Sequence, residues 1–579
     1  MSTPRYRPLL AVYLRPQRRR VAVLVALLFA ALVADLANPL ILRAFIDTVP
    51  HATSPDALIA LAGLFLIVAL LTQAITVAEA YVAQNVGLTA TNGLRADLTR
   101  HLLDLDPAFH NAHTPGELIE RVDGDVATLG NFFSRFAVQL LGNGLLLIGV
   151  LVMLFSIDAL VGVVVTGFTG LALLVVNRLR GVGVPRWSAA RQASADLFGF
   201  LEERLAGTED IRANGATDDA LRRLQTRSRH LLQRQRAAAV VGSATGLSTT
   251  VFLTLGTALA LGVGAYRFTA GAITLGTVYV IFSYTELLRR PVEQITRQLQ
   301  DLQQASAGLR RVSELLQLRP AIRDGSGVPL PTGPLSVDFA AVTFGYAAAE
   351  PVLAGVSFHL PPGTVLGVLG RTGSGKTTLT RLLFRLYDPD GGRIRLGGVD
   401  LRDTLLGDLR LRVGLVTQDI HLFHASVRDN LTFFDRRIPD AQILTVLTDL
   451  GLGAWYSSLA QGLDTRLAPG GGGLSAGQAQ LVAFARVFLR DPGLVILDEA
   501  SSRLDPATEA QVERAIDRLL AGRTAIIIAH RLGTVARADR ILILENGQIG
   551  ETGDRAALAA QPTSRFAALL RTGLEEVPA

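Results

Sequence analysis

Cysteine and lysine are the residues that this sequence lacks or nearly lacks. There is no cysteine, which excludes disulfides, thiolate zinc sites and cysteine nucleophiles. Among the 56 basic residues Lys376 is the one lysine, and all the others are arginine. A lone lysine under such a bias indicates a site where a compact ammonium fits and a wider guanidinium does not.

The overall composition points to a membrane protein with more than one domain. Hydrophobic residues make up 49% of the 579 residues, which is high for a soluble enzyme. The length exceeds that of one ordinary domain. A net charge of +6 is compatible with nucleic-acid binding and equally with the basic cytosolic loops of a membrane protein. The positions of the charges favour the membrane, so no nucleic-acid partner is expected.

Six apolar runs in the first half of the chain are long enough to cross a bilayer, which takes on the order of 20 residues. We expect six transmembrane helices at Val21–Leu42, Ala57–Val77, Phe136–Phe155, Leu160–Val176, Val240–Ala265 and Ala272–Leu288. The second, fifth and sixth runs carry more polar residues, as helices that face one another or a cavity do.

The arginines orient these helices. Four arginines between Arg15 and Arg20 precede the first run, and more fill the segments after the second and fourth runs. The connection Ser156–Ala159 has no basic residue, and the connection Tyr266–Gly271 has one. Since basic loops stay in the cytosol, we expect both termini to be cytosolic in a multi-pass protein of the cytoplasmic membrane. Buried helices of a large soluble protein would not follow this rule.

Helical segments are also expected outside the membrane. Apolar residues alternate with arginines before the first run, which predicts a short amphipathic helix along the inner membrane surface. The two long cytosolic segments have helical periodicity, and turn clusters at Pro107–Gly116 and Gly207–Gly215 interrupt them. We therefore expect the spans to continue into the cytosol and reverse there. Residues 1–318 form this all-α transmembrane domain.

A different kind of sequence follows a segment rich in proline and glycine at residues 319–334, which marks a linker. Beyond it, hydropathy falls and short β-branched runs alternate with helical stretches. This alternation predicts an α/β domain over residues 335–579.

A phosphate-binding loop lies in this second domain. The buried strand expected at Val365–Leu369 leads into a glycine-rich G-x-x-x-x-G-K-T run and then a helix, the required context for a P-loop. Its backbone N–H groups and the helix N-terminus suit phosphates, and the lone lysine falls within it. The candidate nucleotide-binding residues are Gly370, Arg371, Thr372, Gly373, Ser374, Gly375, Lys376, Thr377 and Thr378.

A second expected strand, Leu494–Leu497, ends in Asp498 and Glu499. A carboxylate here suits Mg²⁺, and the next one suits the polarisation of an attacking water. An exposed acidic turn is the commoner explanation of such a pair taken alone, but the phosphate-binding loop makes the catalytic interpretation strong.

With the segment Leu474, Ser475, Ala476, Gly477 and Gln478 between these motifs, the whole chain resembles a half-transporter of the ATP-binding cassette (ABC) exporters. LSAGQ is a one-residue variant of that family's usual LSGGQ signature. Four further positions resemble family motifs in the same order: the adenine-stacking Tyr346, the Mg²⁺-sensing Gln418, the D-loop Asp505 and the switch His530.

The resemblance implies a mechanism. Two ATPase domains would close on two ATP molecules, each held between one chain's phosphate-binding loop and the other's signature segment. Glu499, His530 and Gln418 would be the catalytic residues, and Thr377, Gln418 and Asp498 would hold Mg²⁺. Closure would bring the cytosolic turns together and open the cavity outward, a population shift that ATP drives.

Three departures from the family pattern lie on the signature side. Pro469 replaces a usual glutamate, Ala476 replaces a glycine, and Ala479 replaces a frequent arginine. They suggest a specialised partner-facing surface, and hence a heterodimer with a second half-transporter. A homodimer remains the alternative, since an alanine methyl can be tolerated in the signature.

The expected function is ATP-dependent efflux of an amphipathic solute or lipid. An ATP-gated channel or regulator of the same architecture is the alternative. A soluble ATPase that remodels nucleic acid would need coiled-coil insertions in place of the apolar runs. Asp35 and Glu286 lie in expected spans and Glu79 follows one closely, and all three are candidates to line a cavity. A position at the end of a span, or pairing with an arginine such as Arg289, is at least as good an explanation.

Overall fold

The computed structural model describes residues 7–52, 54–131, 134, 137–347, 350–417, 420–468, 474–498, 506–529 and 535–572. The chain divides into two compact units. The first comprises residues 1–105 and 111–319, and the second comprises residues 106–110 and 320–579. Each unit is described by itself.

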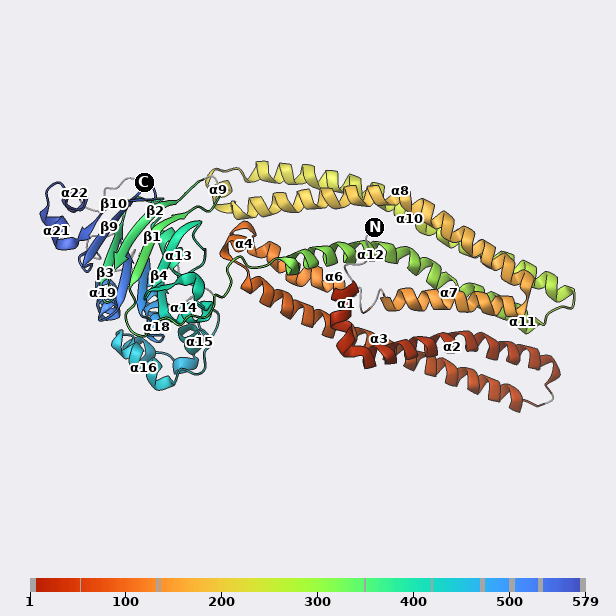
Figure 1. The fold of residues 1–579 in the computed structure, drawn as a ribbon. Helices are drawn as coiled ribbons and strands as arrows, with labels where there is room; N and C mark the ends of the chain where they lie inside the picture. Colours follow the sequence, from red (N-terminus) through yellow and green to blue (C-terminus); the bar gives the residue numbers. More distant parts are fainter. Residues whose placement is uncertain are drawn as a thin grey trace. The chain divides into compact units, whose positions relative to one another are not determined.

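The first unit is entirely helical among its described residues (Figure 1). Its long helices run side by side and are connected by short turns or by short helices. The principal helices are α1 (Arg7–Leu14), α2 (Arg18–Thr48), α3 (Asp56–Asp104), α5 (Pro115–Ile119), a π-helix (Glu120–Asp125), α6 (Val126–Asn131), α7 (Ala137–Ile157), α8 (Ala159–Ala206), α9 (Thr208–Ala213), α10 (Thr217–Thr269), α11 (Leu275–Leu287) and α12 (Arg289–Gln317).

Each of the six predicted spans lies on one of these helices. Among the described residues, α2, α3, α7 and α10 are long and apolar enough to cross a membrane, and Ala159–Val175 in α8 is a shorter apolar stretch. Helix α3 has 49 residues, or roughly 74 Å at 1.5 Å per residue. This is far more than the ~30 Å hydrocarbon core, so such helices extend well beyond the apolar stretch, as predicted.

The start of the sixth span differs from the prediction. We expected it at Ala272, but α11 begins at Leu275, after Thr274. The Thr274 hydroxyl accepts a hydrogen bond from the backbone N–H of Thr277 at 3.2 Å. Such a cap fixes the first helical residue, and Gly271 turns the chain just before it with φ +72°.

Helices α2 and α11 are joined by polar contacts at both ends of their interface. At one end Asp47 accepts from the hydroxyl of Thr274 at 2.8 Å and from the N–H of Gly276 at 2.9 Å. Toward the other, the buried Tyr284 donates to the carbonyl oxygen of Leu36 at 2.8 Å. A β-carbon on Gly276 would lie 2.6 Å from Asp47 Oδ1, so this contact requires glycine.

The second unit is the predicted α/β domain. Its six-stranded sheet has the order β10-β9-β3-β8-β7-β6, in which β10 is antiparallel to β9 and the other pairs are parallel. A four-stranded antiparallel sheet has the order β2-β1-β4-β5. The strands are β1 (Val337–Phe344), β2 (Leu353–Leu360), β3 (Val365–Leu369), β4 (Gly391–Leu396), β5 (Val399–Asp400), β6 (Val413–Val416), β7 (Leu494–Asp498), β8 (Thr524–Ile528), β9 (Arg540–Glu545) and β10 (Gln548–Asp554).

Helices cover both faces of the six-stranded sheet, because its strands alternate their side chains between two cores. Leu366 and Ile496 join one core with helix α13, whereas Leu369 and Leu497 join the other core with helix α18. The helices outside the sheets are α4 (Pro107–Ala112), α13 (Lys376–Leu383), α14 (Leu406–Arg412), α15 (Val427–Thr432), α16 (Asp440–Asp449), α17 (Gly453–Ser457), α18 (Ala476–Phe488), α19 (Pro506–Leu520), α21 (Arg555–Ala560) and α22 (Arg565–Thr572).

Candidate nucleotide-binding site

The loop between β3 and α13 has a backbone that only glycine adopts without strain. Gly370 has φ +148° and Gly375 has φ +102°, a region that L-residues rarely enter. A β-carbon on Gly375 would also lie 2.6 Å from Leu353 Cδ2. The glycines therefore allow the loop to curl at the carboxyl end of β3, where backbone N–H groups can surround an anion.

Lys376 is buried at the start of α13, with 6% of its surface exposed. Its Nζ donates to the carbonyl oxygens of Gly370 at 2.7 Å and Arg371 at 2.9 Å. These contacts hold the ammonium inside the loop, at a point that a phosphate oxygen can share. The buried Ser374 hydroxyl has no hydrogen-bond partner among the described residues, so the loop offers an unused donor. Both features fit a polyphosphate.

Tyr346 lies beside this loop at the end of β1. Its ring is half exposed and makes edge contacts with Phe344 and Tyr387, with ring centroids 5.1 and 5.3 Å away. The hydroxyl lies 3.1 Å from the hydroxyl of Thr378 and accepts from Arg381 Nη1 at 3.1 Å. The ring is therefore held against α13, with the Arg381 guanidinium over it at 5.8 Å from the ring centroid.

Arg381 and Tyr387 were not among the predicted site residues. The signal for Arg381 was available, because Thr378 and Arg381 are three residues apart on one helix and therefore share a face. Tyr387 gave no such signal, since its contact with Tyr346 depends on how strand β1 packs.

The other predicted catalytic segments follow neighbouring strands. Strands β3, β8, β7 and β6 are adjacent and parallel, and their ends lie in register, with Val368 opposite Ile528 and Ile528 opposite Asp498. Ligands of such sheets bind beyond the carboxyl ends of the strands. Asp498 is the last residue of β7, and it stands at the same edge as the phosphate-binding loop.

Four predicted site residues, Gln418, Glu499, Asp505 and His530, lie outside the described residues. The strands that lead toward three of them are described: β6 ends at Val416, β7 at Asp498 and β8 at Ile528. Among the described residues there is no group of three or more His, Cys, Asp or Glu side chains that could hold a metal ion. Mg²⁺ held by one hydroxyl, one carboxylate and the nucleotide needs no such group.

The signature segment forms the N-terminus of α18. Ser475 is the N-cap: its hydroxyl accepts from the N–H of Gln478 at 3.2 Å, and the Gln478 side chain accepts from the N–H of Ser475 at 3.0 Å. Ser475 and Ala476 are exposed, whereas Gly477 is buried. Leu474 and Ala479 pack against the same core as α18. The segment thus presents a hydroxyl and a helix N-terminus to solvent.

This segment and the phosphate-binding loop belong to helices on opposite faces of the sheet. Helix α13 packs through Leu379 and Leu383 into one core, and α18 packs through Leu481 and Phe484 into the other. Neither core therefore places the signature segment next to the phosphate-binding loop of the same chain.

An exposed aromatic patch near α15 was not predicted. Phe423, Phe433 and Phe434 are 40%, 42% and 54% exposed, and Phe433 and Phe434 have φ of +51° and +67°. Bulky residues rarely adopt positive φ. Arg486 lies over the Phe433 ring at 4.6 Å. Burial and the nearby Arg490 lower the pKa of Arg486 to about 10.

Glu286 has partners within the transmembrane unit. It accepts from the hydroxyl of Thr257 at 2.9 Å and lies 3.6 Å from Arg289, so the pairing that we weighed against the lining of a cavity is present. Asp35 lies on α2 and Glu79 on α3.

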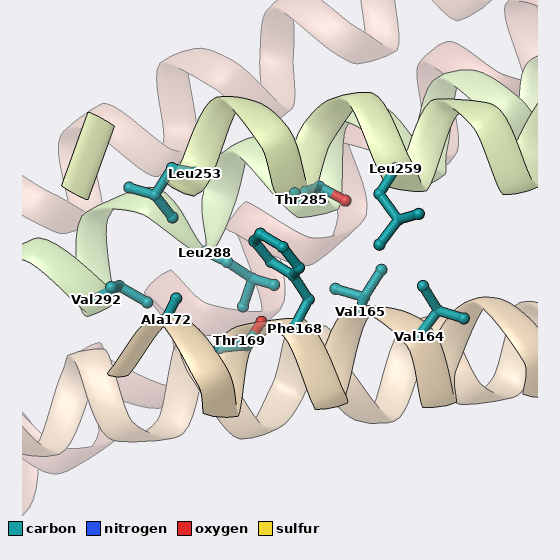
Figure 2. A pocket seen from close by; sticks show the side chains of 11 residues that line it. Val164, Val165, Phe168, Thr169, Ala172, Leu253, Leu259, Thr285, Leu288 and Val292 are labelled. Atoms are coloured by element: carbon teal, nitrogen blue, oxygen red, sulfur yellow. The ribbon is translucent and has the colours of Figure 1, made fainter. Parts of the chain in front are cut away.

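A small apolar cavity of about 20 Å³ lies between α8, α10, α11 and α12. Phe168 projects from α8 into this region beside Thr285 and Leu288 (Figure 2). A volume of this size holds about one water molecule. It is therefore too small to be the binding site of an amphipathic solute.

Comparison with known families assigns both halves of the chain. Residues 21–292 match the family described as the ABC transporter transmembrane region. Residues 353–502 match the family described as ABC transporter, which is the ATP-binding domain of these proteins. A fatty acid ABC transporter ATP-binding/permease protein of Mycobacterium bovis is 31% identical over 81% of this chain and 74% of its own length.

Two further similarities agree with this assignment. An ATP-dependent lipid A-core flippase of Alcanivorax borkumensis is 29% identical over 80% of each chain. The structure of a bacterial Atm1-family ABC exporter with ATP bound aligns with a TM-score of 0.77 and 23% identity, covering 97% of this chain and 99% of that one. It has the same fold: a helical transmembrane domain followed by an α/β ATPase domain. This chain is a membrane-embedded member of the ABC transporter family.

Proposed function

We propose that this chain is one half of a dimeric exporter that uses ATP to move an amphipathic solute or lipid out across the cytoplasmic membrane. The observation that carries the proposal is the buried Lys376 in the curled loop after β3, in the same chain as helices long and apolar enough to cross a membrane. The relatives named as fatty acid transporter and lipid flippase support a lipid-like substrate.

The residues of the site divide the work of ATP hydrolysis. The loop N–H groups, the Ser374 hydroxyl and Lys376 would bind the phosphates, while Tyr346 would stack on the base. Mg²⁺ would be bound by Thr377, Asp498 and Gln418. It would supply positive charge to the terminal phosphates. Glu499 would orient and polarise the attacking water, and His530 would contact the terminal phosphate.

A second chain would complete the site. Because α13 and α18 occupy opposite faces of the sheet, we infer that the signature segment serves the nucleotide of the partner. Its exposed Ser475 hydroxyl and the uncovered end of α18 would then add donors to the charge that develops on the phosphates. Asp505, in the segment resembling the D-loop, would lie at that dimer contact.

The partner is proposed to be a different half-transporter. Ala476 is exposed at the first turn of α18 and Ala479 packs into the core, so this side of the domain lacks the family's usual glycine and arginine. Expression of the chain alone tests the proposal. We expect a purified protein that hydrolyses ATP poorly until the second chain is supplied. A fully active homodimer would contradict it.

Movement would pass through the helical reversals. Helices α3, α8 and α10 have 49, 48 and 53 residues, so each links the predicted membrane region to a distant turn. At the first reversal, the Asp106 carboxylate accepts from the backbone N–H groups of Ala321 and Ile322 at 2.6 and 3.3 Å. The start of the linker to the ATPase domain is therefore tied to the turn that would dock on that domain.

The experiment is transport into inverted vesicles with a panel of amphipathic compounds and lipids. We expect ATP-dependent accumulation against a gradient for at least one compound, and none with Glu499→Gln. Passive equilibration that ATP merely switches on would instead support the ATP-gated channel.

A further inference from the structure

The start of α2 and the 3-10 turn before it (Arg15–Gln17) carry four arginines that the proposed function does not use. Arg15, Arg18, Arg19 and Arg20 are all exposed, and none of them forms an ion pair with any residue that the structure describes. The first turn of α2 contains no acidic residue, and its N-cap residue Gln17 makes no capping hydrogen bond through its side chain. The four guanidinium charges therefore have no acidic neighbour in this turn.

An open hollow in the surface lies beside these charges. Residues Pro16–Arg20 line an open hollow of about 520 Å³. Within it Gln17 is only 8% exposed, and its Nε2 donates to the carbonyl oxygens of Tyr13 and Val86, both at 3.3 Å. Gln17 Oε1 is enclosed and has no hydrogen-bond partner among the described residues. A ligand in the hollow therefore meets the guanidinium groups and not this acceptor.

The segment is held in place on α3. Tyr13 donates to Asp97 Oδ2 at 2.9 Å. Gln17, one helical turn after Tyr13, donates to the carbonyl oxygen of Val86. Helix α1 accordingly lies across α3 (Figure 1). Fixed positions lower the entropic cost of binding.

The arginines also stand where the membrane is predicted to begin. Val21 opens the first apolar run directly after Arg20, and the buried Leu24 and Leu28 then pack with Ala83 and Val138. Clustered basic residues at the cytosolic end of a span meet the headgroups of the inner leaflet.

We propose that Arg15, Arg18, Arg19 and Arg20 form a binding site for the headgroup of an anionic phospholipid of the inner leaflet. The guanidinium groups would bind the phosphate. Phosphatidylglycerol carries this phosphate with a net negative charge and is the probe of choice. Phosphatidylcholine has the phosphate but no net negative charge.

Native mass spectrometry of the intact protein in detergent, titrated with each lipid, tests the site. We expect phosphatidylglycerol to bind more tightly than phosphatidylcholine. Each single change Arg18→Gln, Arg19→Gln or Arg20→Gln should weaken phosphatidylglycerol binding about fivefold, since one arginine near anionic lipid contributes about 1 kcal/mol. The triple variant should lose the preference. The single variants keep three arginines and therefore remain informative if the triple variant fails to insert.

A control comes from Arg222, Arg223 and Arg229, which are exposed on α10. Arg222 and Arg223 pair with Asp219, and all three lie at least roughly 16 Å of helix before the predicted fifth span at Val240. Changing all three to glutamine should therefore leave lipid binding unaltered. Equal affinity of the wild type for both lipids, or unchanged binding by the arginine variants of α2, would overturn the proposal. Displacement of the lipid by inorganic phosphate at matched ionic strength would overturn it too, because it would identify a site for free phosphate.

Discussion

At the scale of single residues, the phosphate-binding loop depends on backbone conformations that a β-carbon prevents. We predict that Gly375→Ala weakens ATP binding at least tenfold, because it adds both left-handed strain and a contact 2.6 Å from Leu353 Cδ2. Titration with a fluorescent ATP analogue measures the affinity.

Gly398→Ala is the control for strain alone. Gly398 has φ +82° with nothing within 4 Å of its added β-carbon, and it lies in the turn between β4 and β5. The left-handed strain alone should cost Gly398→Ala about 1 kcal/mol of stability. Its affinity for ATP should be unaltered. Wild-type affinity in Gly375→Ala would contradict the assigned role of the loop.

Tyr346 allows stacking to be separated from hydrogen bonding. Tyr346→Ala should weaken nucleotide binding about tenfold, since stacking on a base contributes roughly 1–3 kcal/mol. Tyr346→Phe keeps the ring and loses only the contacts of the hydroxyl with Thr378 and Arg381, so its affinity should stay within about twofold. Equal losses in the two variants, measured by the same titration, would show that the hydroxyl and not the ring face matters.

At the scale of elements, Ser475 caps α18 and is also proposed to face the nucleotide of the partner. Ser426 caps α15 in the same way, accepting from the N–H of Asp429 at 3.0 Å. We predict that Ser475→Ala and Ser426→Ala each cost about 1 kcal/mol of stability, but that only Ser475→Ala abolishes ATP hydrolysis. Thermal unfolding and ATPase assays of the assembled transporter measure both. Parallel losses of activity would reduce Ser475 to a structural cap.

Asp158 fixes the turn between α7 and α8. Burial opposes ionisation, but hydrogen bonds from the Val161 N–H and from Arg267, together with the charge of Arg267, lower the pKa of Asp158 below its usual value. The Arg267 guanidinium lies 2.6 Å away. Because the pKa is lower in the folded state, the stabilisation is present at neutral pH and is lost as the pH falls through that pKa.

We therefore expect Asp158→Asn to cost about 2 kcal/mol at pH 7 and progressively less as the pH falls below about 4, as measured by unfolding in detergent. Glu314→Gln, which breaks an exposed pair with Arg310, should cost under about 1 kcal/mol. A cost for Asp158→Asn that does not change with pH would refute the ionic role.

Local patterns in the sequence predicted the helices, the phosphate-binding loop and the signature segment, because each depends on residues close together in the chain. Contacts between distant segments could not be predicted in this way. Asp47 and Thr274 are 227 residues apart, and their hydrogen bond contributes to the late start of α11. The aromatic patch could not be predicted either, because Phe433 and Phe434 have positive φ, a backbone conformation that phenylalanine rarely adopts.

At the scale of the whole molecule, two units with separate cores belong to one chain. The ATPase unit has its own sheets and cores, and the helical unit has long helices that reverse at short ones. Energy from the nucleotide can move the helices only if ATP binds differently to two arrangements of the protein. Lys376 is the residue on which that binding most depends.

ATP binding by the purified chain in lipid nanodiscs is therefore the most direct measurement, made with the wild type, Lys376→Ala and Glu499→Gln. We expect saturable binding of ATP by the wild type and Glu499→Gln, and a loss of at least about a hundredfold in affinity with Lys376→Ala. A wild type that does not bind ATP in the bilayer, or a Lys376→Ala variant that binds it as well as the wild type, would refute the proposed role of Lys376.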